Sequence, residues 1–125
     1  MRLLLDTQIY LWYLADAPKL SKKARAGIRG ADDVFISAAS IWEAAVKVGT
    51  GKLEVTPGDL VAGIAGSGFT ELPVTAMHAA LVASLPYHHR DPFDRLLVAQ
   101  AMHEPLRLLT ADVTLRRYSD LVELV

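Results

Sequence analysis

The chain has 125 residues, of which 52% are hydrophobic and 22% charged, with a formal net charge of −1. This length allows one domain with a single core, and the apolar content excludes an intrinsically disordered chain. The near-zero net charge excludes a broadly basic nucleic-acid-binding protein, so any basic surface must be local. The absence of cysteine excludes thiol catalysis, cysteine-ligated zinc and disulfide bonds.

The N-terminus begins with a short apolar run at residues 3–5, which Asp6 ends. The run is far too short for a signal peptide or a membrane span. We therefore expect a soluble, cytoplasmic protein with no membrane partner. The same run predicts a buried strand whose last residue precedes Asp6.

Helical patterns and a second strand follow. Residues 9–14 are apolar and aromatic and predict the first turns of a helix. Ser21 is expected to cap a short basic helix over residues 22–28. Residues 34–36 predict another short strand, and residues 37–48 place apolar side chains at helical spacing.

The middle of the chain continues this alternation. A proline at the start of residues 58–65 favours a helix there, and residues 69–74 alternate enough to predict a third strand. Residues 75–85 predict a helix capped by Thr75, and residues 86–90 predict a loop.

The last part of the chain adds the remaining elements. Asp91 and a following proline open a helix that ends before Pro105, and residues 106–110 predict a fourth strand. A short helix then leads to a last strand at residues 121–125. Short apolar strands that alternate with helices predict a single α/β domain of three layers, with a central parallel sheet of four to five strands flanked by helices.

Acidic residues fall where such a fold binds ligands, outside the carboxyl ends of the strands. Asp6 follows the first predicted strand, and Asp112 follows the fourth. Asp91 and Asp94 begin a helix, and Glu43 lies about two turns into another. We therefore expect these carboxylates to converge at one edge of the sheet.

Most of these acids also have a purely structural interpretation. Asp91 suits a helix N-cap, and Asp94 suits the dipole of the same helix. Glu43 and Lys47 have the i,i+4 spacing of a surface ion pair. Asp112 can cap the short helix that follows it.

Converging carboxylates repel one another unless a cation lies among them. We find no lysine or histidine at a matching strand end, and Asp6 is difficult to explain by a structural role. A divalent cation is the economical explanation, and an all-oxygen ligand set favours Mg²⁺ or Mn²⁺ over zinc. One or two such ions would polarise a phosphodiester and activate water for in-line attack.

Four sequence blocks together resemble the PIN-domain proteins of the VapC-like toxin group. They lie in the order of that family and span nearly the whole chain. The blocks are residues 4–7 (LLDT), 37–43 (SAASIWE), 89–97 (HRDPFDRLL) and 109–112 (LTAD).

The resemblance implies a PIN fold and a Mg²⁺- or Mn²⁺-dependent endoribonuclease that is the toxin of a toxin–antitoxin pair. It also implies a homodimer, an RNA substrate and a cognate antitoxin. The positions that match the acidic site of the family are Asp6, Glu43, Asp94 and Asp112, as catalytic residues and metal ligands. Asp91 receives a secondary role, as a helix cap with a water-mediated contact to the metal.

One departure from the family pattern is visible at Gln8, where many relatives of this subgroup have histidine. The departure puts a ligand or RNA-contact role at this position in doubt and leaves the acids intact. Beside the acids, Thr7, Ser40 and Thr110 can orient a carboxylate or hold a water, or can serve as caps.

Basic residues near the expected cleft can bind RNA phosphates or simply balance the local acids. They are Lys47, Lys52, Arg90 and Arg95.

Histidines and aromatic residues have structural interpretations here. We expect His88 and His89, in a loop bounded by prolines, to be solvated rather than catalytic. We expect Trp12, Tyr13 and Trp42 to pack in the core or at a dimer interface rather than to stack on bases.

Three alternative functions have sequence requirements that can be compared with this chain. An aspartyl-phosphate phosphatase usually needs a second aspartate two residues after Asp6, where this chain has Gln8, and a later lysine. A phospho-receiver domain needs an acidic pair near its first strand and a lysine after its last. The remaining alternative is a catalytically inactive PIN-like module that binds RNA or protein. Such a scaffold would be expected to have lost one or more of the four acids, and all four are present.

Overall fold

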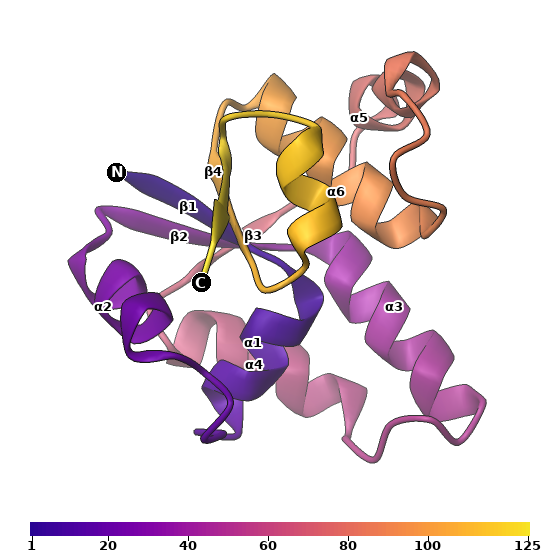
Figure 1. Ribbon diagram of the computed structural model, residues 1–125. Coiled ribbons are helices and arrows are strands. Elements are labelled where there is room, and N and C mark those ends of the chain that lie inside the picture. Colours follow the sequence, from indigo (N-terminus) through magenta and orange to yellow (C-terminus); the bar gives the residue numbers. More distant parts are fainter.

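The computed structural model describes all residues, 1–125, and its centre is one five-stranded sheet (Figure 1). Every neighbouring pair of strands is parallel, in the order β3-β2-β1-β4-β5. The strands are β1 (Arg2–Leu5), β2 (Asp33–Ser37), β3 (Thr70–Leu72), β4 (Arg107–Thr110) and β5 (Val122–Leu124). The predicted parallel sheet is confirmed, with the larger of the two predicted strand numbers.

Six α-helices connect and cover these strands. They are α1 (Thr7–Leu14), α2 (Lys22–Gly30), α3 (Ala38–Gly49), α4 (Pro57–Gly66), α5 (Ala76–Leu81) and α6 (Pro92–His103). The chain contains no helix with both the length and the apolar character that crossing a membrane requires.

Alternate residues of the central strand build two separate cores. Leu3 and Leu5 pack in the core with α1, α2 and α4, whereas Leu4 packs in the core with α5 and α6. The two groups of helices cover opposite faces of the sheet (Figure 1). All three leucines are fully buried. A strand buried on both faces explains the continuous apolar run in the sequence and confirms the three-layer arrangement.

Capping residues identified from the sequence begin the helices as expected. Ser21, Thr75 and Asp91 each accept a hydrogen bond from a backbone N–H in the first turn of α2, α5 and α6, respectively. These bonds satisfy backbone donors that the helix itself leaves unpaired.

The boundaries of two helices differ from the prediction. Helix α1 begins at Thr7, earlier than the apolar run suggested, because the side chain of Asp6 caps it. The predicted helix over residues 75–85 stops at the end of α5 and continues as a 3₁₀ turn, Val82–Ser84. The side chain of Arg95 binds the carbonyls of Val82 and Leu85 there, so this backbone turns toward a buried cation. The short helix before β5 is likewise a 3₁₀ turn, Val113–Arg117.

The three aromatic residues expected in the core do not behave alike. Trp12 and Tyr13 pack against the core, and Tyr13 also packs against the ring of Phe69. Trp42 is 61% exposed and makes an edge-to-face contact with Phe93. Trp42 therefore does not occupy a core position, and its place at a dimer interface stays a prediction.

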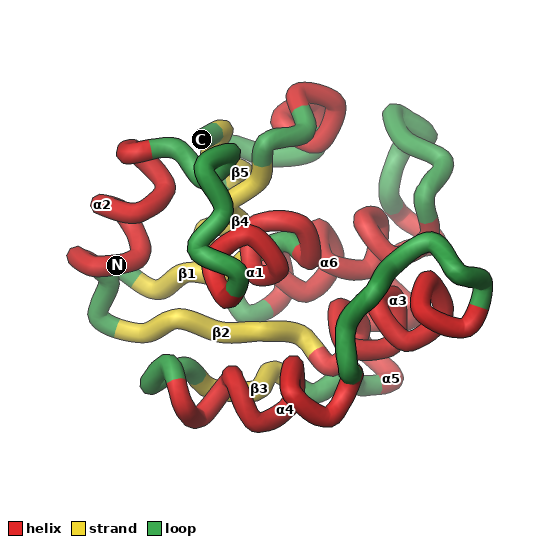
Figure 2. Tube along the Cα trace, turned by 90° about the horizontal axis from the view of Figure 1, so that it is seen from below, coloured by secondary structure: helices red, strands yellow, loops and turns green.

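The strand order determines where a ligand can bind. The chain places β2 and β3 on one side of β1 and then β4 and β5 on the other. In such sheets the ligand crevice lies outside the carboxyl ends of the two strands at the reversal, here β1 and β4. Figure 2 shows that β2 leads directly into α3, which extends beyond this edge of the sheet.

Candidate active site

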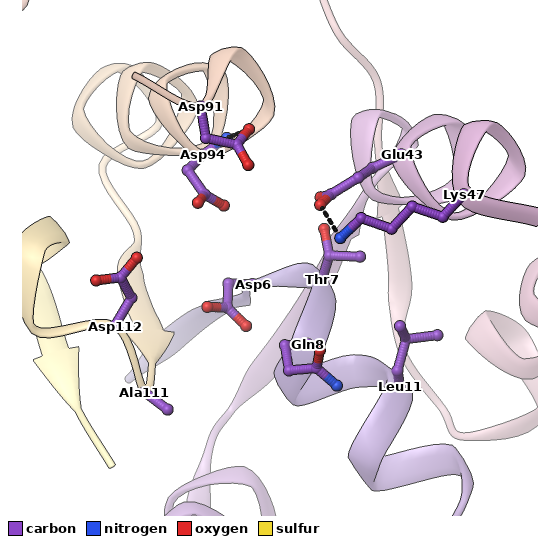
Figure 3. A pocket seen from close by; sticks show the side chains of 10 residues that line it. All are labelled: Asp6, Thr7, Gln8, Leu11, Glu43, Lys47, Asp91, Asp94, Ala111 and Asp112. Carbon is purple, nitrogen blue, oxygen red and sulfur yellow. Dashed lines mark hydrogen bonds and ion pairs between the residues drawn. The ribbon is translucent and has the colours of Figure 1, made fainter. Parts of the chain in front are cut away.

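A cavity of about 310 Å³ opens at the carboxyl ends of β1 and β4, and five carboxylates line it (Figure 3). The acids come from four separate parts of the chain, as the sequence predicted. The lining residues are Asp6, Thr7, Gln8, Leu11, Glu43, Lys47, Asp91, Asp94, Ala111 and Asp112.

Asp6 lies at the base of the cavity, directly after β1. Its Oδ1 accepts the Ile9 N–H at 2.8 Å, and its Oδ2 accepts a hydrogen bond from the Thr110 hydroxyl. Burial raises the pKa of Asp6 to about 6, although both hydrogen bonds act in the opposite direction. The carboxylate therefore carries a charge that its own hydrogen bonds do not fully compensate.

The start of α6 contributes two acids with different positions. Asp91 caps the helix, since its Oδ1 accepts the N–H groups of Phe93 and Asp94 at 2.8 and 3.3 Å. Asp94 points into the cavity toward Asp6 and Asp112 (Figure 3). The predicted cap at Asp91 is thus confirmed.

The charge of Asp94 is unfavourable in this structure. Burial is the main cause that raises its pKa to about 7, and the neighbouring charges of Asp91, Asp6 and Glu43 raise it further while His89 opposes them. Such a shift in a cleft is typical of a group that binds a ligand of opposite charge.

Glu43 reaches the cavity from α3 and combines both roles considered for it. Its Oε2 accepts a hydrogen bond from Lys47 Nζ at 2.9 Å, which confirms the i,i+4 ion pair. The side chain is nevertheless buried, and its Oε1 has no hydrogen-bond partner. A buried carboxylate oxygen that accepts no hydrogen bond destabilises the folded state unless a ligand contacts it.

Three small hydroxyl side chains lie beside the acids and form hydrogen bonds there. Thr7 donates to Ser40 at 2.9 Å in the buried contact between α1 and α3. Thr110 donates to Asp6 and accepts the Asp112 N–H at 3.0 Å, so it joins two of the acids. Gln8 is exposed at the rim of the cavity.

Asp112 and His89 form a contact that the sequence analysis did not predict. Asp112 Oδ1 caps the following 3₁₀ turn through the Thr114 N–H, and Oδ2 lies 2.9 Å from His89 Nε2. His89 also approaches Asp94 at 3.3 Å, and its side chain is only 22% exposed. The expectation of a solvated histidine was therefore wrong for His89. No lysine or histidine lies at a matching strand end, but His89 reaches these acids from the loop before α6.

The prediction that Arg95 contacts RNA is also wrong. Arg95 is buried, and its guanidinium donates to the carbonyls of Pro86, Val82 and Leu85. It also donates to the Tyr118 hydroxyl at 3.2 Å and lies over the Tyr87 ring, 4.1 Å from its centroid. These bonds hold the loop before α6 and leave the group unavailable to a ligand.

The acids fit a divalent cation of the hard, oxygen-preferring kind. The donors that face the cavity are carboxylate oxygens, one of them unpartnered. Two basic side chains contact the acids: Lys47 pairs with Glu43, and His89 contacts Asp94 and Asp112. Two of the acids have strongly raised pKa values, chiefly because they are buried, so a bound cation would stabilise their charged forms.

The molecule is a parallel α/β domain with an acidic cavity at its strand reversal, and comparison identifies the family. The family model described as the PIN domain matches residues 3–121. The chain therefore belongs to the PIN domain family, as its four sequence blocks suggested.

Individual relatives agree with this assignment. Ribonuclease VapC22 of Mycobacterium tuberculosis is 31% identical over 121 residues, which cover 92% of this chain and 90% of the relative. The crystal structure of VapBC2 from Rickettsia felis, bound to a DNA fragment from its promoter, covers 100% of this chain and 98% of its own at a TM-score of 0.70 and 16% identity. FitAcB from Neisseria gonorrhoeae covers 90% of this chain and 89% of its own, at a TM-score of 0.61 and 20% identity. At these identities the two structures show a common fold.

Proposed function

We propose that the chain is a Mg²⁺- or Mn²⁺-dependent endoribonuclease that acts in the cytoplasm as the toxin of a toxin–antitoxin pair. The observation that carries this proposal is the convergence of five carboxylates around the unpartnered, buried Oε1 of Glu43. The curated relative named a ribonuclease supports the activity. A structure of similar fold, a toxin–antitoxin complex from Klebsiella pneumoniae with a TM-score of 0.59 and 17% identity, supports the biological role.

Asp6, Glu43, Asp94 and Asp112 would hold the cation, and Asp91 would contact it through water. The cation would polarise a phosphodiester of the bound RNA and lower the pKa of an attacking water. The chain itself supplies position: Asp6 is fixed by two hydrogen bonds, and Glu43 is held by Lys47. In phosphoryl transfer such positioning accounts for most of the catalysis, so no further reactive side chain is required.

RNA would approach along a second hollow that adjoins the acidic cavity. This hollow, of about 380 Å³, shares Glu43, Lys47 and Asp91 with the cavity. Its other lining residues include Arg90 and Lys52, both of them exposed. We assign phosphate contacts to Lys47, Arg90 and Lys52, because exposed cations beside a phosphodiester site attract the RNA backbone.

A homodimer and a cognate antitoxin complete the proposal. The toxin–antitoxin complex from Klebsiella pneumoniae supports an antitoxin partner for a protein of this fold. Sedimentation analysis of the purified chain would test the dimer. Co-purification with the product of an adjacent small reading frame would test the antitoxin.

The decisive experiment is a calorimetric titration of Mn²⁺ into the metal-stripped protein, followed by an assay of RNA cleavage. We expect saturable binding and Mn²⁺-dependent cleavage by the wild type and loss of both in the Asp6→Asn/Asp94→Asn double variant. Asp120→Asn is a matched control, since this exposed acid pairs only with Arg116. Absence of binding and of cleavage in a folded wild type would favour the inactive binding module.

A further inference from the structure

His89 connects the two elements that carry Asp94 and Asp112. Its Nε2 lies 2.9 Å from Asp112 Oδ2 and 3.3 Å from Asp94 Oδ2. On the opposite side of the ring, Nδ1 accepts the backbone N–H of Asp91 at 3.0 Å. The ring is therefore held between the start of α6 and the loop that follows β4.

The Asp91 N–H determines which ring nitrogen carries the proton. A backbone N–H can only donate, so Nδ1 must offer a lone pair and the proton of the neutral ring lies on Nε2. In this state Nε2 donates to the carboxylates. His89, Asp94 and Asp112 are close enough together to hold an ion by distance alone. The hydrogen bonds nevertheless place His89 outside the ligand set, because a protonated nitrogen has no lone pair for a metal.

Buried contacts fix the backbone of His89 as well as its ring. The His89 N–H donates to the Tyr118 hydroxyl at 2.9 Å, and Arg95 donates to the same hydroxyl at 3.2 Å. Arg95 also binds three carbonyls of the preceding turn and loop. The buried arginine therefore supports the position of the histidine.

Of the acids, Asp112 makes the shorter contact with His89 and uses it to fix one of its two oxygens. It lies on a loop, and its side chain is 34% exposed. One oxygen accepts the Thr114 N–H, and the other accepts the His89 hydrogen bond. Loss of the second bond would free the carboxylate to rotate away from the cavity.

We propose that His89 is a positioning residue that orients Asp112 for cation binding. The inference rests on the proposed function, since it takes Asp112 as a ligand. Outer partners that hydrogen-bond to metal ligands typically contribute about 10–100-fold to metal affinity. His89 supplies this hydrogen bond to Asp112. The Asp91 N–H keeps the proton of the ring on Nε2, so that Nε2 can donate it.

The test compares Mn²⁺ affinity among variants of the metal-stripped full chain by calorimetry. We expect His89→Ala to bind Mn²⁺ about tenfold more weakly than the wild type. His89→Gln should recover most of the affinity, because the glutamine amide can donate from near the position of Nε2. His88→Ala is the matched control and should bind as the wild type does, since His88 contacts the Tyr118 ring and none of the acids.

A second measurement needs no variant. Ring ¹⁵N spectra of the wild type with Mg²⁺ should show His89 protonated on Nε2, whereas a proton on Nδ1 would show ligation through Nε2 and overturn the inference. The inference also fails if His89→Ala binds Mn²⁺ as tightly as a wild type that binds the ion. It fails as well if His89→Gln binds Mn²⁺ as weakly as a folded His89→Ala does. In those cases the proposed function stands. Absence of Mn²⁺ binding by the wild type would contradict both.

Discussion

The charge of Asp94 should destabilise the metal-free protein, so Asp94→Asn should stabilise it. Burial and three neighbouring carboxylates raise the pKa of Asp94 to about 7 from an ordinary 3.8. The amide of asparagine has nearly the same shape and carries no charge. The substitution therefore removes the repulsion and leaves the packing at the start of α6 in place.

The magnitude follows from the two pKa values. Their difference of roughly three pH units corresponds to about 4 kcal/mol at roughly 1.4 kcal/mol for each unit. The Asp94 side chain is 18% exposed, so water screens part of the repulsion between the carboxylates. We therefore expect a gain of about 2 kcal/mol in the free energy of unfolding, which corresponds to about 8 °C in Tm for a chain of this size.

The effect must depend on pH in a definite direction. Because the pKa is raised in the folded state, the folded protein binds the proton more tightly than the unfolded chain. Wild-type stability is then lost as the pH rises from the ordinary pKa through the folded-state pKa, and the loss is complete above about pH 7. The advantage of Asp94→Asn should be less than half as large at about pH 5 as at about pH 8.

Urea unfolding of the metal-stripped proteins at these two pH values would measure the difference. Mn²⁺ at about a hundred times its Kd should reverse the order, since it stabilises the wild type by about 2.7 kcal/mol and the variant by less. Asp120→Asn, which removes an exposed acid, should show none of these effects. A metal-free wild type more stable than Asp94→Asn at about pH 8, or a difference independent of pH, would refute the reasoning.

Three further predictions concern other parts of the molecule. Glu43→Gln should weaken Mn²⁺ binding by about tenfold in calorimetry with little change in Tm; a fall in Tm with unchanged affinity would leave only the ion pair as its role. The double variant Arg90→Ala/Lys52→Ala should lower the salt dependence of RNA binding by about 1.4 in the log–log slope, at about 0.7 for each lost phosphate contact; an unchanged slope would remove the second hollow from the RNA path. Gly63→Ala should cost about 1–3 kcal/mol in urea unfolding, since its Cβ would lie 2.9 Å from a tyrosine hydroxyl. Gly58→Ala meets no atom within 4 Å and should be neutral or stabilising.

The fold was predictable from the sequence because local signals and global packing agree. The apolar run at residues 3–5 was identified as a buried strand, and it is the central strand with both faces covered. Ser21, Thr75 and Asp91 marked helix starts, since each has a side-chain oxygen suited to the first turn. The 3₁₀ turn after α5 was not predictable, because it depends on a buried arginine from a distant segment.

The roles of the basic residues could not be predicted with the same success. Arg95 is adjacent to Asp94, and proximity in sequence suggested a common site. On a helix, neighbouring residues point about 100° apart, so Asp94 faces the cavity and Arg95 faces the loop beneath it. His89 precedes the helix, and its approach to Asp112 depends on a loop path that periodicity does not describe.

From the sequence, a structural role and a role in the site were alternative interpretations of the acids. In the structure, the same acid can have both roles. A carboxylate has two oxygens and about four acceptor positions, so one oxygen can serve the backbone while the other serves the site. Asp6 and Asp112 each use Oδ1 to cap a helical turn, and their Oδ2 atoms contact the Thr110 hydroxyl and His89, respectively. Glu43 pairs with Lys47 through one oxygen and keeps the other unpartnered. A satisfied cap or ion pair at such a position therefore argues for a fixed ligand oxygen rather than against a metal site.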